Sequence, residues 1–290
     1  MRRLALLLTL GSAVTVAAQD DAADLAAVLQ RAGERVERYF TRAQSIVCRE
    51  IVRWMPLTPT LVSAGFGRTV ESELRLSWAP ADDGTPANEA RTIRELLRVN
   101  GREPQKNDWR NCTDPEQQAS EPQPLSILLP AQRGGFEFKL AGRARLDGRS
   151  AIMVDYKIRK RAAVTSSLVE GRDDCVTYNI DGGTRGRVWI DADTYDVLRL
   201  DQALIGMVDI PLPKKITLPF NGATYWTAER MDTTIRFKAI AFNNPDETLV
   251  LPVTMTQFRI TRGAGTSRLW TTTDYTQYRR FLTAGRIVPQ

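Results

Sequence analysis

The chain has 290 residues, of which 42% are hydrophobic and 26% are charged, and this balance is typical of a globular protein. Its net charge is +6, but the basic residues form no block with interleaved aromatic side chains, so nucleic-acid binding is not expected. The basic excess leaves open a weak peripheral contact with anionic membrane surfaces. The chain contains no histidine, which excludes nucleophiles activated by histidine and every histidine-based metal site.

The N-terminus has the layout of a cleavable secretion signal. Arg2 and Arg3 give a cationic start, an apolar run extends to Val16, and small side chains end at Ala18. A membrane anchor is the alternative, but the run is shorter than the ~20 apolar residues that cross a bilayer. We therefore expect cleavage after Ala18, a periplasmic or secreted location, and one soluble domain over residues 19–290 without a transmembrane segment.

Three cysteines remain in the exported chain. Cys112 and Cys175 lie in polar, loop-like surroundings, whereas Cys48 lies in an apolar segment and is expected to be buried. Since disulfides form in oxidising compartments, the sequence predicts a Cys112–Cys175 bridge with Cys48 as a core thiol. In the chain-entropy model, a bridge that closes so long a loop contributes roughly 4 kcal/mol.

Residues Asp20 to Gln44 are predicted to form one amphipathic helix, with Asp20 or Asp21 as its N-terminal cap. Its apolar side chains recur every three or four residues and define one face: Leu25, Val28, Leu29, Ala32, Val36, Tyr39 and Phe40. The charged side chains fall mostly elsewhere and are interpreted as solvated. Because they are mixed in sign, a helix that covers a core is favoured over one that lies on a membrane.

Beyond the helix, the hydrophobic period changes from about 3.6 residues to two. Alternation between apolar and polar residues is typical of antiparallel strands with one buried face. The candidate strands lie in residues 46–54, 70–78, 93–99, 136–140, 152–158, 187–191, 197–204, 233–242, 253–261 and 267–275. The pattern thus predicts a mainly β protein of the α+β class, with about ten strands and one long helix.

The connections are predicted to be polar, with two exceptions. Asn100-Gly101 is a turn signal, and the segments 105–123 and 162–183 are interpreted as long loops. Leu125 to Leu129 is apolar and is expected to form a short helix. The segment 210–227 is rich in both proline and apolar residues, and we interpret it as a surface crossover, with a lid over the sheet as the alternative.

Few residues suggest chemistry. There is no phosphate-binding loop or dinucleotide fingerprint, so no cofactor and no metal are expected. The glycine-rich segment Gly182 to Gly186 precedes a strand rather than a helix, and we interpret it as a turn. Glu50 is the one acid that the alternation points inward, and it requires an arginine partner unless the strand twists it outward. Asp191 and Asp193 flank a hairpin and are expected to form its turn.

Several segments resemble known proteins. Residues Gly186 to Asp201 are similar to a strand–turn–strand hairpin of the periplasmic lipoprotein-carrier-like (LolA-like) fold family, and a helix followed at once by antiparallel strands fits that family too. Three further segments, 45–50, 244–252 and 274–281, resemble a group of uncharacterised secreted proteins of soil bacteria. The resemblance implies a curved antiparallel sheet or incomplete barrel, with the helix packed on its concave face and an apolar cavity for acyl chains. It carries over no catalytic residue.

The resemblance therefore predicts an exported, non-catalytic envelope protein that binds a lipid or a lipoprotein acyl chain. The side chains expected to line the cavity are Leu74, Leu76, Trp78, Phe136, Phe138, Val154, Tyr156 and Ile158. The same residues could instead form an ordinary core beneath the helix, which would make this a structural or interaction protein without a ligand. A carboxylate-dependent hydrolase is the third possibility, and it requires two inward carboxylates within ~10 Å of each other.

Overall fold

A computed structural model describes residues 14–42, 46–77, 89–109, 119–122, 124–169, 175–217, 223–243, 246–263 and 265–280. The strands are β1 (Ile46–Pro56), β2 (Arg68–Ser77), β3 (Glu89–Val99), β4 (Ala119–Pro122), β5 (Phe136–Leu146), β6 (Arg149–Ile158), β7 (Ala163–Leu168), β8 (Val176–Asp181), β9 (Thr184–Asp191), β10 (Val197–Leu204), β11 (Val208–Pro211), β12 (Tyr225–Asn243), β13 (Asp246–Arg262) and β14 (Thr266–Arg280). The helical segments are α1 (Val14–Arg42), η1 (Lys106–Trp109), η2 (Pro124–Leu128), α2 (Pro130–Arg133) and α3 (Lys214–Thr217).

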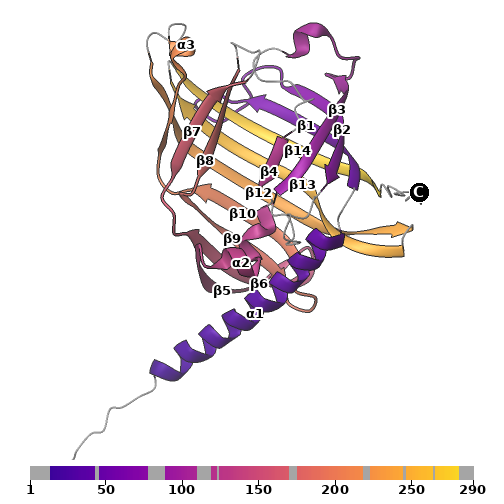
Figure 1. Cartoon of the computed structure of the whole chain (residues 1–290), viewed down its shortest axis with the longest axis vertical. Coiled ribbons are helices and arrows are strands. Elements are labelled where there is room, and N and C mark those ends of the chain that lie inside the picture. The colour runs from indigo at the N-terminus through magenta and orange to yellow at the C-terminus, as the bar shows by residue number, and fades with distance from the viewer. Residues whose placement is uncertain are drawn as a thin grey trace, which may run out of the picture.

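One large antiparallel sheet dominates the described part of the chain. Its strands follow the order β4-β3-β2-β1-β14-β13-β12-β10-β9-β6-β5, with β11 paired to β12. The first and last strands of the chain, β1 and β14, lie side by side in the middle of this order (Figure 1). The sheet is open, because β4 and β5 at its two edges do not pair with each other. The predicted class, a mainly β fold with an open antiparallel sheet and one long helix, is confirmed.

One end of helix α1 packs against the sheet, and the other end extends away from the sheet (Figure 1). The buried side chains Val28, Leu29, Ala32, Val36 and Phe40 belong to the predicted apolar stripe. The predicted start at Asp20 is wrong, because the helix already begins at Val14. The intervening residues include alanine and contain no glycine or proline, so nothing interrupts the helix before Asp20.

The main core lies between α1 and the face of the sheet that α1 covers, which we call the inner face. On β6, Ile152, Val154 and Tyr156 are buried and belong to this core, whereas Asp155 between them is only half-buried. Strands β9 and β10 add buried side chains in the same way, among them Val188 and Leu200. The alternating pattern in the sequence therefore separates an inner face from an outer face, as in other half-buried antiparallel sheets.

Local irregularities bend the two longest strands. The pairing of β12 with β13 shifts register between Ala228 and Arg230 and again between Arg236 and Phe237. An extra residue on one strand bends it and increases the local twist. Tight hairpins depend on residues that accept a positive φ, as at the predicted turn of Asn100 (φ 49°) and Gly101 (φ 79°).

Two predicted connections contain regular structure instead. The segment 162–183 was expected to be a loop, but β7 and β8 form a separate two-stranded sheet within it. Its consecutive polar residues hide the strand pattern. Contacts with neighbouring strands hold it in place: the Ser166 hydroxyl donates to the Pro211 carbonyl, and Arg259 of β13 donates to the Tyr178 hydroxyl. The segment 210–227 is likewise not a simple crossover, because it contributes β11, α3 and the start of β12.

The other predicted connections agree more closely with the structure. Leu125 to Leu129 was expected to be a short helix, and η2 followed by α2 occupies this position. The segment 105–123 was expected to be a long loop, but its described residues include η1 and the edge strand β4. Among the described helices, none combines the length and the apolar character needed to cross a bilayer.

Candidate ligand-binding site

Seven of the eight predicted cavity residues lie in the described part of the chain, and they are distributed over three strands of the inner face. Val154 is completely buried, and Leu74 and Tyr156 are each 3% exposed. The eighth, Trp78, lies outside the described residues. Val154 and Tyr156 belong to the main core together with residues of α1. These two side chains therefore contact packed protein on the inner face.

The remaining predicted cavity residues are less buried. Leu76, Phe136 and Phe138 are partly buried and pack against the main core. The ring of Phe136 lies 6.0 Å from that of Phe138 and 6.2 Å from that of Tyr156, measured between centroids. Ile158, at the end of β6, is half-buried. The aromatic residues of β5 and β6 thus form one cluster, and whether any of the predicted residues contacts a ligand stays a prediction.

A cavity opens on strands β5, β6, β9, β10 and β12, and both charged and apolar groups line it, including the predicted cavity residues Phe138 and Tyr156. Its volume is about 930 Å³, and acidic and basic side chains line it in equal number: Glu137, Asp155, Asp201, Asp232, Lys139, Lys157, Arg185 and Arg187. The indole of Trp189 lies among them, with the guanidinium carbons of Arg199 and Arg187 at 4.6 and 5.8 Å from its ring centroid. The eight charged side chains in its lining suit this cavity less well to an acyl chain than aliphatic side chains would.

A second pocket, of about 300 Å³, lies between α1 and the inner face. Its apolar lining comes from α1, η2, β10, β12 and β13, through Val36, Leu125, Val197, Ala239, Leu249 and Val250. Val36, Leu125, Val197 and Leu249 are each buried in the main core, so the pocket opens directly from it. None of the predicted cavity residues contributes to the described lining of this pocket.

Three arginines of α1 complete the lining of this pocket, which we call the helix–sheet pocket. Arg35, Arg38 and Arg42 all line it, and Asp196 is the only acid among the described residues of its lining. The Arg35 Nε donates to the Thr194 carbonyl at 2.8 Å and lies 3.8 Å from the Asp196 Oδ1. From the sequence alone, Arg35 and Arg38 are interpreted as solvated charges, and Arg42 is not singled out. Their spacing of three and four residues was the signal that places them on one side of the helix.

Buried groups near the C-terminal end of α1 are kept neutral. Burial, and then the nearby Glu50, raises the pKa of the Cys48 thiol to about 12. Burial likewise raises the pKa values of Tyr39 and Tyr278, and the Tyr278 hydroxyl donates to the Pro252 carbonyl. A thiol with so high a pKa is a poor nucleophile. Cys48 is therefore a free, buried core thiol, as predicted.

The inward acid Glu50 has the arginine partner that the sequence requires. Glu50 is 2% exposed, and Arg94 of β3 donates to both of its carboxylate oxygens, from Nε at 2.7 Å and from Nη2 at 3.2 Å. A bidentate pair of this kind holds the carboxylate in place and occupies both oxygens. Glu50 thus forms a structural ion pair.

The buried acid Asp191 forms a turn, as predicted. Its Oδ1 accepts hydrogen bonds from the backbone N–H groups of Asp193 and Thr194, at 3.0 and 2.8 Å. Burial alone would raise the pKa of Asp191, but these N–H groups and the Arg149 cation hold it below its ordinary value. Within the described residues, no cluster of three or more metal-ligating side chains occurs.

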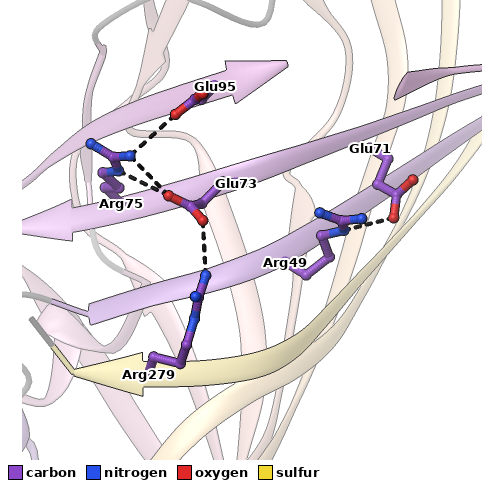
Figure 2. A network of polar contacts seen from close by, with 6 residues as sticks. All are labelled: Arg49, Glu71, Glu73, Arg75, Glu95 and Arg279. Carbon is purple, nitrogen blue, oxygen red and sulfur yellow. Dashed lines mark hydrogen bonds and ion pairs between the residues drawn. The ribbon is translucent and has the colours of Figure 1, made fainter. Parts of the chain in front are cut away.

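Outer-face charges near β1 form a paired network. Figure 2 shows Arg75 between Glu73 and Glu95, with Nη2–O distances of 2.9 and 3.1 Å, while Arg279 of β14 reaches Glu73 at 2.8 Å. Arg49 pairs with Glu71 at 2.6 Å in the same view. These arginines face away from the core and each has a carboxylate partner.

Similarity to known proteins is limited to structure. No protein-family model matches the chain. No curated protein matches it. The chain is similar to the crystal structure of a DUF1329 family protein from Desulfovibrio piger (TM-score 0.45, 10% identity, covering 90% of this chain and 94% of that one). It is also similar to a LolA superfamily protein from Nitrosomonas europaea (TM-score 0.35, 9% identity, covering 90% and 97%).

These structures thus include a member of the LolA superfamily, the family that the sequence resembles. At this level of identity and TM-score, the likeness does not bear on what the chain binds.

Proposed function

We propose that this chain is an exported, non-catalytic envelope protein that binds an acyl chain of a lipid or lipoprotein between α1 and the inner face of its sheet. One observation carries the proposal: a pocket of about 300 Å³ opens between α1 and β13, with aliphatic side chains and three arginines in its lining. Burial of an acyl chain contributes ~0.8 kcal/mol per methylene. A pocket of this size suits part of one chain rather than a whole diacyl lipid.

The proposed removal of residues 1–18 is compatible with this site. Cleavage after Ala18 would shorten α1, which begins at Val14. The buried stripe of the helix begins further along, at Val28, and the helical residues that line the pocket begin at Arg35. The mature protein would therefore keep the whole site and its contacts with the sheet.

A second function, an interaction protein with a filled core, is favoured by a different observation. Val154 and Tyr156 are buried in the main core, where the resemblance predicts a cavity. In that case the helix–sheet pocket would hold only water, and partners would bind the outer surface.

Native mass spectrometry of the protein purified from the periplasm, followed by lipid extraction, separates the two functions. A bound lipid and saturable uptake of a fluorescent fatty acid are expected. Replacing Ala239 at the mouth of the pocket (Ala239→Trp) should block uptake, because the indole would fill the space beside Leu249 and Val250. Ala163→Trp on exposed β7 is the matched control and should bind normally. A lipid-free mass together with no uptake by the unmodified protein would contradict the proposal.

We also propose the disulfide bridge between Cys112 and Cys175. Cys175 is 3% exposed, and Cys112 lies outside the described residues. Thiol labelling of the purified protein should find no reactive thiol in the native state, because Cys48 is buried, and one free thiol after unfolding without reductant. Three free thiols after unfolding would refute the bridge.

A further inference from the structure

We propose that Arg38 and Arg42 bind an anionic headgroup at the mouth of the helix–sheet pocket, so that the preferred ligand is an acyl chain with a terminal carboxylate or phosphate. This inference rests on the proposed function, because it names the chemical class of ligand for the same site.

The helix places charge and apolar surface side by side. Arg35, Arg38 and Arg42 are three, four and seven residues apart and therefore lie along one side of α1. Val36 is 2% exposed and belongs to the core, whereas Arg38 and Arg42 are exposed. A ligand whose chain enters beside Val36 would have its polar end next to these guanidinium groups.

The three arginines differ in how they are already engaged. Arg35 is held by the Thr194 carbonyl and by Asp196, so it fastens α1 to the turn between β9 and β10. Arg38 donates from Nε to the Glu34 carbonyl at 3.2 Å, which leaves its terminal nitrogens to other partners. Arg42 makes no hydrogen bond or ion pair with any residue that the structure describes.

Few carboxylates belong to the described lining of the pocket. Asp196 is the one acid in the described lining of the pocket, against three arginines, and it already lies beside Arg35. The outer-face network is the opposite case, because Arg49, Arg75 and Arg279 each have a glutamate partner (Figure 2). The positive charge at the pocket mouth is thus not balanced within the described lining, and an anionic headgroup would complement it.

The neighbouring surfaces fit an amphiphile rather than a free anion. Beneath the arginines the pocket is lined by Leu125, Val197, Leu249 and Val250, which offer no partner for a second charge. Guanidinium groups bind carboxylates and phosphates in paired hydrogen bonds, so either headgroup satisfies the same geometry. A neutral chain of equal length would keep the apolar contacts and lose the ionic ones.

Isothermal titration of the mature protein with dodecanoate, dodecyl phosphate and dodecanol tests the inference. Hydrogen bonds to charged groups predict that the anionic ligands bind on the order of tenfold tighter than dodecanol. Whichever of the two anions binds tighter identifies the headgroup chemistry. The double variant Arg38→Gln/Arg42→Gln should lose that preference and bind all three ligands with similar affinity.

Two controls keep the outcomes distinct. Arg143→Gln/Arg145→Gln on exposed β5 removes the same charge away from the pocket and should bind like the unmodified protein. Since a cation in the last helical turn also stabilises a helix, the unfolding of each variant is measured in parallel. Equal affinity for dodecanol and the anions, or an equal loss in the β5 control, would overturn the headgroup site. Failure of all three ligands to bind would instead contradict the proposed function.

Discussion

On strands β6, β9 and β10 the two faces of one sheet are built in contrasting ways. Val154, Val188 and Leu200 on the inner face are each at most 1% exposed and pack beneath α1. On the outer face of the same strands, Arg187 pairs with Asp155 at 2.5 Å and Arg199 with Asp201 at 2.8 Å. The inner face is held by burial and the outer face by exposed ion pairs. The comparison predicts that equally conservative changes have large effects on one face and small effects on the other.

The largest effect is expected where α1 meets the sheet. Phe40→Ala removes a ring that is 2% exposed and packs edge-on against Tyr39 at 5.2 Å. Loss of a buried aromatic side chain should lower the free energy of unfolding by about 3–5 kcal/mol, measured by urea denaturation. Thr41→Ala, at the next and exposed position, should change it by only about 0.5 kcal/mol. Similar values for both variants would mean that α1 is not docked as described.

The inward ion pair is the next test. Arg94→Met would leave the Glu50 carboxylate buried without its bidentate partner and should cost about 3 kcal/mol. The double variant Glu50→Leu/Arg94→Met should recover most of that loss, because no buried charge then remains. If the single variant is as stable as the unmodified protein, Glu50 is solvated and does not belong to the inner face.

A smaller effect is expected where Tyr156 crosses β9. A Cβ on Gly186 would lie 1.9 Å from the Asp201 carbonyl oxygen and 2.6 Å from the Tyr156 ring. Gly186→Ala should therefore displace both the β10 backbone and the ring and destabilise the protein by about 2 kcal/mol, as overpacked cores do. Gly134→Ala is the control, because no atom lies within 4 Å of its added carbon. Comparing the melting temperatures of the two variants by calorimetry separates the clash at residue 186 from the general effect of replacing a glycine.

The smallest effect belongs to the outer network of Figure 2. The Arg75 guanidinium, with help from Arg279, holds the pKa of Glu73 below its ordinary value. Such a group stabilises the fold above its unfolded pKa of ~4.3, and this contribution is lost as the pH falls through its folded pKa. Glu73→Gln should therefore cost at most about 1 kcal/mol at pH 7 and less at pH 3, with the difference reduced by salt.

If Glu73→Gln lowers the free energy of unfolding by more than about 1 kcal/mol, or if the loss grows as the pH falls, the predicted contrast between the inner and outer faces is wrong.

The parts of the fold that were predictable follow from local patterning. Val154 and Tyr156 alternate with Asp155 and Lys157, and this period of two is enough to predict a strand and its buried face. Glu50 could be recognised as an inward acid in need of an arginine for the same reason. The β7–β8 hairpin was missed because Thr165, Ser166 and Ser167 interrupt the alternation, and contacts with β11 and β13 position it.

The candidate site was less predictable than the fold. Val36 was expected to face the core, but the pocket beside it also requires Leu125 and Leu249, which are distant in the sequence. Which strand lies beneath the last turns of α1 depends on tertiary packing and not on any local motif. Arg35 and Arg38 of α1 were interpreted as solvated for the same reason, since their role depends on what lies next to them.

The most direct test of the central claim is photocrosslinking of a fatty acid that carries a diazirine near its methyl end. After irradiation with the mature protein, peptide mass spectrometry should place the label on residues that line the helix–sheet pocket, such as Val36, Leu125 and Leu249. Excess dodecanoate, added before irradiation, should compete with the probe and reduce this labelling. Labelling confined to the outer face around Trp189, or labelling that dodecanoate does not reduce, would contradict an acyl-chain site between α1 and the sheet.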